Sequence, residues 1–175
     1  MIKGKKSLLI TNVSRIDYPG LRDRQEVSSL GLLIYFENTQ LILRINIGST
    51  GQNVDFAFQG QEELSLFFSE YYGVLVIDHG LTSKLSQLQG RSVINMYLGY
   101  YSEENTSIQG TNFELLSEEM VAIQLYLSDT NIFTFYNDGD EGHYSFSMPL
   151  RTPELPFGNI SWRELYMPPA CDLIP

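Results

Sequence analysis

The segment of the chain with the highest density of reactive side chains is Asn137-Asp138-Gly139-Asp140-Glu141-Gly142-His143. It holds three carboxylates, an amide and an imidazole, and oxygen ligands at this density are typical of calcium loops. An EF-hand loop that starts at Asp138 needs Gly at its sixth position and Glu at its twelfth, but His143 and Pro149 stand there. We therefore favour a solvated turn, with a metal or partner contact as the alternative, and predict no metal site.

Other candidates for catalysis lack a partner at the right spacing. Asp78 and His79 end an apolar segment, but neighbours on a strand point to opposite faces, so Asp78 is poorly placed to orient His79. The single cysteine, Cys171, excludes an internal disulfide and every multi-cysteine metal site. The sequence contains no nucleophile elbow, phosphate-binding loop or dinucleotide-binding glycine pattern. We predict that the protein is not an enzyme and holds no cofactor.

Two adjacent carboxylate pairs, Glu103–Glu104 and Glu118–Glu119, have the residue type that glycosidases use. Glycoside hydrolysis needs two carboxylates that face each other across a cleft, and adjacent residues do not supply that separation. We expect these side chains to be solvated. A hydrolase whose site assembles from distant Asp, Glu and His residues stays open as an alternative.

The charge of the chain is concentrated in its second half. Of the net charge of −10, residues 1–90 carry nine acidic and eight basic side chains, whereas residues 91–175 carry twelve acidic and three basic ones. Ordinary soluble surfaces intersperse both signs. The negative field of residues 91–175 repels nucleic acid and anionic lipid and attracts basic proteins. A surface whose charge only keeps the protein soluble is the simpler interpretation.

Tyrosines accompany this charge, and tyrosine beside carboxylate suits the binding of Lys and Arg through ion pairs and cation–π contacts. We predict a partner-binding surface formed by Glu103, Glu104, Glu118, Glu119, Asp138, Asp140, Glu141, Tyr100 and Tyr101. The alternative is that the tyrosines occupy ordinary strand positions with their hydroxyls at the surface.

A repeat at an offset of 91 residues predicts the strands on which this surface would lie. Residues 34–41 read again as 125–132, and Asn46, Gly48 and Gly51 recur at 137, 139 and 142. In the first copy, apolar residues alternate over 30–36 and 41–47, and a loop at 37–40 would pair Ile34 with Leu43 and Leu32 with Ile45. The same shift places Ile132 and Tyr136 in the pattern of the return strand and Phe133 and Phe135 on its opposite face, so we expect this strand to be buried on both sides.

The fold predicted from these signals is β-rich α+β, with two duplicated antiparallel units and one intervening helix. The units are residues 1–59 and 90–148, each opened by an apolar strand, over 7–18 and 92–101. Between them, residues 60–89 contain an apolar helical stripe from Leu64 to Tyr71. Six of the seven prolines lie in residues 149–175, which we expect to form an irregular surface tail. The apolar link favours one compact domain.

These features favour a non-enzymatic acidic protein that masks a basic protein partner, as inhibitors and toxin-immunity proteins do. Binding of that kind weakens with salt. No apolar run approaches the roughly 20 residues of a membrane span, and the basic start lacks a signal-peptide core, so we expect a cytoplasmic protein. Two further alternatives are a small-molecule or carbohydrate-binding β domain with a pocket between the two units, and a structural subunit of a larger assembly.

Overall fold

The computed structural model describes residues 7–19, 28–49, 51–71, 75–80, 82–101, 119–139, 141–152, 154–155 and 158–165. These residues form mostly antiparallel β-sheet with one α-helix in the described ranges, which confirms the predicted β-rich α+β class. Four consecutive antiparallel strands make a first meander: β1 (Leu8–Asp17), β3 (Gly31–Phe36), β4 (Ile42–Ile47) and β5 (Val54–Gln59). Four more make a second meander: β7 (Ser92–Tyr101), β8 (Glu119–Leu127), β9 (Ile132–Asn137) and β10 (Gly142–Ser145).

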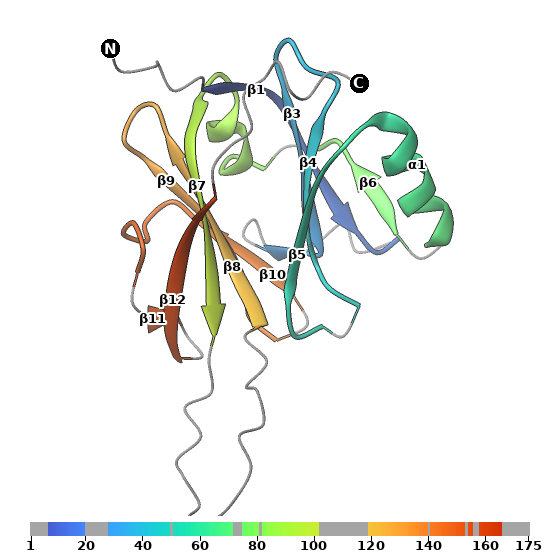
Figure 1. Cartoon of the computed structure of the whole chain (residues 1–175). Coiled ribbons are helices and arrows are strands. Elements are labelled where there is room, and N and C mark those ends of the chain that lie inside the picture. Colours follow the sequence, from blue (N-terminus) through green and yellow to red (C-terminus); the bar gives the residue numbers. More distant parts are fainter. Residues whose placement is uncertain are drawn as a thin grey trace, which may run out of the picture.

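Smaller elements complete the fold. They are β2 (Ser28–Ser29), α1 (Gln61–Glu70), β6 (Val76–Asp78), the 3-10 helix η1 (Leu85–Leu88), β11 (Glu154–Leu155) and β12 (Gly158–Leu165). The two meanders join where β1 pairs with β7 through Leu8 opposite Val93, and again where β2 pairs with β10. They face each other in Figure 1, with α1 beyond the first meander and β12 at the edge of the second.

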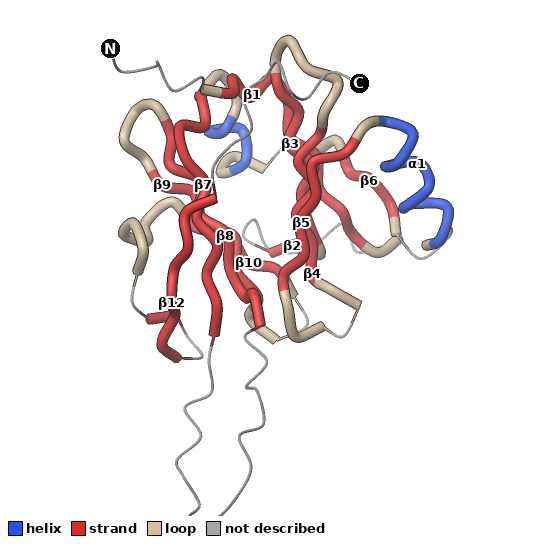
Figure 2. Tube along the Cα trace, viewed as in Figure 1, coloured by secondary structure: helices blue, strands red, loops and turns tan. Residues whose placement is uncertain are grey.

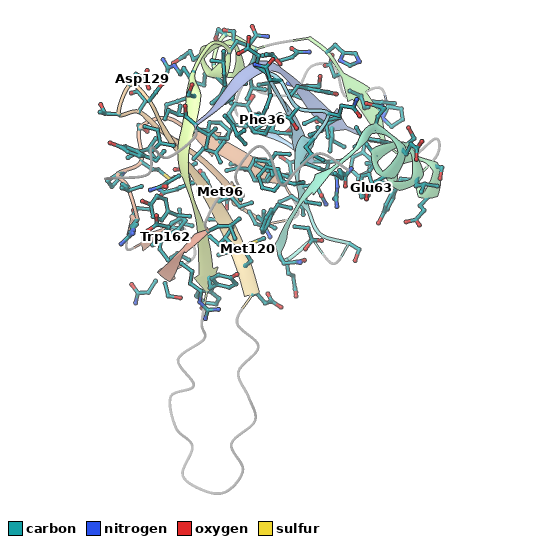
Figure 3. The ribbon with its side chains drawn as sticks, turned by 45° about the horizontal axis from the view of Figure 1, so that its top comes forward. Phe36, Glu63, Met96, Met120, Asp129 and Trp162 are labelled. Carbon is teal, nitrogen blue, oxygen red and sulfur yellow. The ribbon has the colours of Figure 1, made fainter. Side chains whose placement is uncertain are left out.

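The space between the meanders is filled by the main hydrophobic core. This cluster combines buried residues of both meanders, among them Ile34 and Leu43 from the first and Leu125 and Phe135 from the second. In Figure 3, Phe36 and Met96 point into this space from the two sides. The pocket expected between the two units is therefore occupied by core side chains.

The first hairpin has the register that its alternating apolar residues predict. On β3 and β4, Ile34 lies opposite Leu43 and Leu32 lies opposite Ile45, and all four side chains are fully buried. Asn38 takes a positive φ of 57° in the connecting turn, a conformation that Asn tolerates better than most residues. Cross-strand pairing of two apolar faces thus fixes the register.

The second hairpin is shifted by one residue from the predicted register. Phe135 lies opposite Ile123 and Phe133 opposite Leu125, so both phenylalanines face the main core and are fully buried. The prediction that Ile132 and Tyr136 share the face of the inward residues of β8 is wrong. The physical reason is the loop: Thr130 adopts a positive φ of 66°, and Leu127 pairs with Asn131 across three residues instead of four. A one-residue slip exchanges the two faces of a strand.

The outer face of the first meander is covered by α1, and β6 extends its sheet beside β1 (Figure 2). Leu64, the buried residue of the helix, packs on Ile16, Leu33 and Ile42. The first backbone N–H, from Gly60, donates to Glu63 Oε2 at 2.7 Å, and acidic residues in the first turn suit the positive end of the helix dipole. Gly73 follows the apolar stripe at a position where glycine commonly ends a helix, but it lies outside the described residues.

The outer face of the second meander is covered by residues that follow β10. In this region the prediction of an irregular tail is wrong for residues 158–165. They form β12, which pairs with β7 from Met96 to Tyr101. The prolines of this region lie before and after this segment, so each of its residues can donate to a ladder. Trp162 Nε1 donates to the Thr152 carbonyl at 2.6 Å, and the Trp162 ring occupies the space that a side chain at Gly99 would need.

Candidate functional site

Five of the nine predicted partner-binding residues lie at one end of the second meander. Tyr101 pairs with Glu119 across β7 and β8. Because Ala122 lies opposite Tyr136, the turn after β9 that carries Asp138 and Glu141 lies beside the first residues of β8. We call this group, with Tyr100, the acidic end: Tyr100, Tyr101, Glu119, Asp138 and Glu141. The other four predicted residues, Glu103, Glu104, Glu118 and Asp140, lie outside the described residues.

The three arginines of residues 91–175 contact groups within the same half of the chain. The Arg163 guanidinium lies 4.4 Å from the centre of the Tyr100 ring, and Arg151 lies 4.7 Å from that of Tyr97. Arg91 pairs with Asp129 at 3.3 Å. Within the described ranges, no basic nitrogen lies within 4.0 Å of the Glu119 or Asp138 carboxylate. Neither of these two exposed carboxylates therefore forms an ion pair with another described residue.

Residues 137–139 and 141–143 meet in a tight turn between β9 and β10. The Asp138 N–H donates to the Glu141 carbonyl at 3.0 Å, Gly139 has a φ of +60°, and Gly142 pairs with Asn137. The buried Asn137 amide donates to the Gly51 carbonyl of the other meander at 2.8 Å. No group of three His, Cys, Asp or Glu side chains suited to a metal ion occurs among the described residues.

The recurring glycines do not share a conformation. Gly139 and Gly51 have positive φ, whereas Gly48 and Gly142, their partners in the repeat, do not. The turn from β4 to β5 is also longer than the turn from β9 to β10. The recurrence of these glycines therefore does not reflect one common turn geometry.

Asp78 and His79 contact different groups. Asp78 Oδ1 accepts the Gly80 N–H at 2.8 Å, as in a turn that ends a strand, and its Oδ2 lies 3.5 Å from Arg15 Nη2. His79 Nδ1 lies 2.9 Å from the Ser14 hydroxyl. Ser14 is fully buried, so this Ser–His pair has no accessible nucleophile.

A buried charged cluster connects the two meanders near these residues. Arg15 Nη2 contacts Asp17 Oδ2 at 2.6 Å, and both side chains are 5% exposed. Burial raises the pKa of Asp17, against the lowering effect of the Arg15 charge. Burial also raises the pKa of Tyr144, whose hydroxyl lies 3.3 Å from that of Thr82. Because a substrate cannot reach these groups, we assign the cluster a structural role.

A cleft of about 520 Å³ lies on the outer face of the first meander, a size typical of small-molecule sites. It exists because α1 covers only part of that face. Ile42, Arg44 and Asn46 alternate outward along β4, and the helix packs on Ile42, whereas the half-buried Arg44 and the buried Asn46 line the cleft. Phe67 of α1 and Tyr71, the residue that follows the helix, form one wall, and the turn from β4 to β5 forms another.

Arg44 is the cationic side chain in the described lining of the cleft. Its guanidinium lies 4.1 Å from the centre of the Phe67 ring, and its Nε donates to Gln59 Oε1 at 3.2 Å while its Nη1 donates to Asn46 Oδ1. Burial lowers the pKa of Arg44, partly offset by the Asp55 carboxylate. Three protein contacts thus hold the guanidinium in one orientation.

Comparison with family models, curated proteins and solved structures gave no match. The assignment of the site residues therefore depends on their geometry in the structure alone. None of the helices in the described ranges has the length and apolar character needed to cross a bilayer.

Sequence reasoning did not anticipate the cleft. Its lining comes from β1, β4, β5, α1 and the residue before β6, which are distant along the chain. The one available signal was Arg44, a charged residue within an otherwise apolar strand, at a position that faces α1.

Proposed function

We propose that the protein is a non-enzymatic binding protein whose acidic end masks a basic protein partner. The observation that carries this proposal is the gathering of Glu119, Asp138 and Glu141 beside Tyr100 and Tyr101 at one end of the second meander. Negative charge suits a surface rich in Lys and Arg, and the Tyr100 ring already contacts one cation, Arg163 of its own chain. A partner that must itself be basic, such as a nucleic-acid-binding enzyme or toxin, fits this chemistry.

The net charge of −10 supports the same proposal through association kinetics. A field of one sign steers an oppositely charged partner and raises its association rate by about 10- to 1000-fold at low salt. Because this effect is long-ranged, masking does not require a deep pocket. It does require free carboxylates at the acidic end, and neither Glu119 nor Asp138 forms an ion pair with another described residue.

We further propose that the two meanders are copies of one unit, related by the offset of 91 residues. Both consist of a long first strand followed by three shorter or equal strands in the same sequential antiparallel order. In this proposal the second copy acquired the carboxylates. The equivalent part of the first copy, Asn46 to Gln52, has none.

The first experiment is a capture from the lysate of the native host at low ionic strength, eluted with a salt gradient and identified by mass spectrometry. The wild-type protein is compared with a variant that carries Glu119→Lys and Asp138→Lys. The matched control carries Glu62→Lys and Glu70→Lys, two exposed positions of α1 with the same change in charge.

The proposal predicts a basic protein that leaves the wild type and the α1 control only at high salt, and that the acidic-end variant fails to retain. Equal retention by all three proteins, or a bound species that does not respond to salt, would contradict masking by the acidic end. A folded state in each variant, checked by circular dichroism, separates loss of binding from loss of structure.

A further inference from the structure

The cleft beside Arg44 has features of a built site that the proposed masking function does not use. Arg44 is half-buried, and two of its nitrogens are held by Gln59 and Asn46. Its Nη2 has no hydrogen-bond partner among the described residues, and no described carboxylate lies within 4.0 Å of the guanidinium. A fixed guanidinium with free donors matches the planar geometry of a carboxylate.

The rest of the lining favours an aromatic ligand body. The Phe67 and Tyr71 rings lie 5.1 Å apart on the helix wall, and Tyr18, which is 42% exposed, stands at another wall. Aliphatic side chains from Ile47 and Leu75 complete the apolar part. Such a surface gains free energy by removing a ring from water, and aromatic pairs add to that gain.

The charges around the cleft disfavour a ligand with more than one negative charge. Asp55 also lines the cleft, where it accepts a hydrogen bond from Asn53 Nδ2 at 2.9 Å and leaves Arg44 without an ion pair. One Arg and one Asp give the described lining of the cleft no net charge, and the whole chain carries −10. A phosphate dianion or a polyanion is therefore disfavoured relative to a monoanion.

We propose that this cleft binds a small aromatic monocarboxylate, with the carboxylate on Arg44 Nη2 and the ring against Phe67 and Tyr71. This site is separate from the acidic end, which belongs to the other meander, so the two proposals stand or fall independently. The size of the cleft, about 520 Å³, accommodates a fused two-ring acid.

The test is an NMR titration of the full ¹⁵N-labelled protein with naphthalene-2-carboxylate and, separately, with naphthalene-2-carboxamide. The two probes share their ring and differ in charge. We expect the carboxylate to bind at least about tenfold more tightly, with shift changes at the Arg44 side-chain Nε–H and at the Phe67 and Tyr71 amides. Equal affinity of the two probes, shift changes confined to other parts of the protein, or no binding of either probe at millimolar concentration would overturn the proposal.

Variants sharpen this test. Arg44→Gln should reduce the carboxylate affinity to that of the carboxamide, but it also removes the contact with Phe67 and can loosen α1. Asp55→Asn is therefore the decisive variant, because it should raise the carboxylate affinity about two- to threefold and leave the carboxamide unaffected, a gain that partial unfolding cannot produce. Arg151→Gln, on the second meander, is the control for general charge and should change neither affinity. An unchanged carboxylate affinity in Asp55→Asn would contradict the proposed role of the cleft charges.

Discussion

Gln124 connects the second meander to the segment that covers it, and its replacement by Leu should destabilise the protein strongly. The side chain is fully buried on β8. Its Nε2 donates to Thr134 Oγ1 at 3.1 Å and to the Pro149 carbonyl at 2.9 Å, and its Oε1 accepts the Arg151 N–H at 2.7 Å. One amide thus satisfies three polar groups.

The expected cost follows from these three bonds. An intramolecular hydrogen bond contributes about 1 kcal/mol net, and a polar group left buried without a partner costs about 1–3 kcal/mol. Leu has a similar size, so cavity formation adds little. We therefore expect Gln124→Leu to lower the free energy of unfolding by about 3 kcal/mol. The control, Thr134→Val, removes one of the bonds and should cost about 1 kcal/mol.

The assay is urea denaturation followed by fluorescence of Trp162, the one tryptophan of the chain, whose indole N–H donates to Thr152 in the same covering segment. With an m-value of about 2 kcal/mol/M, a loss of 3 kcal/mol moves the midpoint down by about 1.5 M. A Gln124→Leu midpoint equal to that of the wild type would refute the reasoning, because it would show that the covering segment does not depend on this amide.

Two further predictions concern a glycine and a carboxylate. Gly142→Ala should lower the free energy of unfolding, measured by thermal unfolding, by about 3 kcal/mol, because a Cβ there meets the Phe135 ring and lies 2.7 Å from a backbone oxygen. Gly139→Ala should lower it by about 1 kcal/mol, because the site has open space but a positive φ. A larger loss for Gly139→Ala than for Gly142→Ala would contradict the packing around Gly142. The pKa of Asp129 is lowered, chiefly by the Asn131 side chain, so its ionised form stabilises the fold above pH 3.8 and this contribution disappears as the pH falls through the lower folded-state pKa. An NMR titration of Asn131→Ala should show the Asp129 pKa return toward 3.8, and an unchanged value would contradict this cause.

The sequence predicts elements well where one strong local signal dominates. Alternating apolar residues on both sides of Asn38 predict the first hairpin in its correct register. The second hairpin fails because a positive φ at Thr130 shortens its loop by one residue, and neither residue type nor spacing announces that. The strand over 158–165 was missed because the surrounding prolines dominated the interpretation, although this segment contains none.

The candidate sites were predictable to different degrees. The acidic end combines residues from β7, β8 and a following turn, and the predicted strands already imply that their ends lie together. The cleft depends on how far α1 extends over the outer face of the first meander. Tertiary packing decides that coverage, so a helix predicted from its apolar stripe does not reveal the uncovered part.

The most direct test of the masking proposal is the association rate of the captured basic partner, measured by stopped flow as a function of ionic strength. The account predicts that the acidic-end variant, Glu119→Lys with Asp138→Lys, lowers the association rate constant about tenfold at 20 mM salt. The α1 control, Glu62→Lys with Glu70→Lys, should lower it less than about threefold. The difference between the two variants should vanish near 1 M salt, where the screening length is about 3 Å. Equal rate constants for the two variants at low salt would contradict the claim that the acidic end receives the partner.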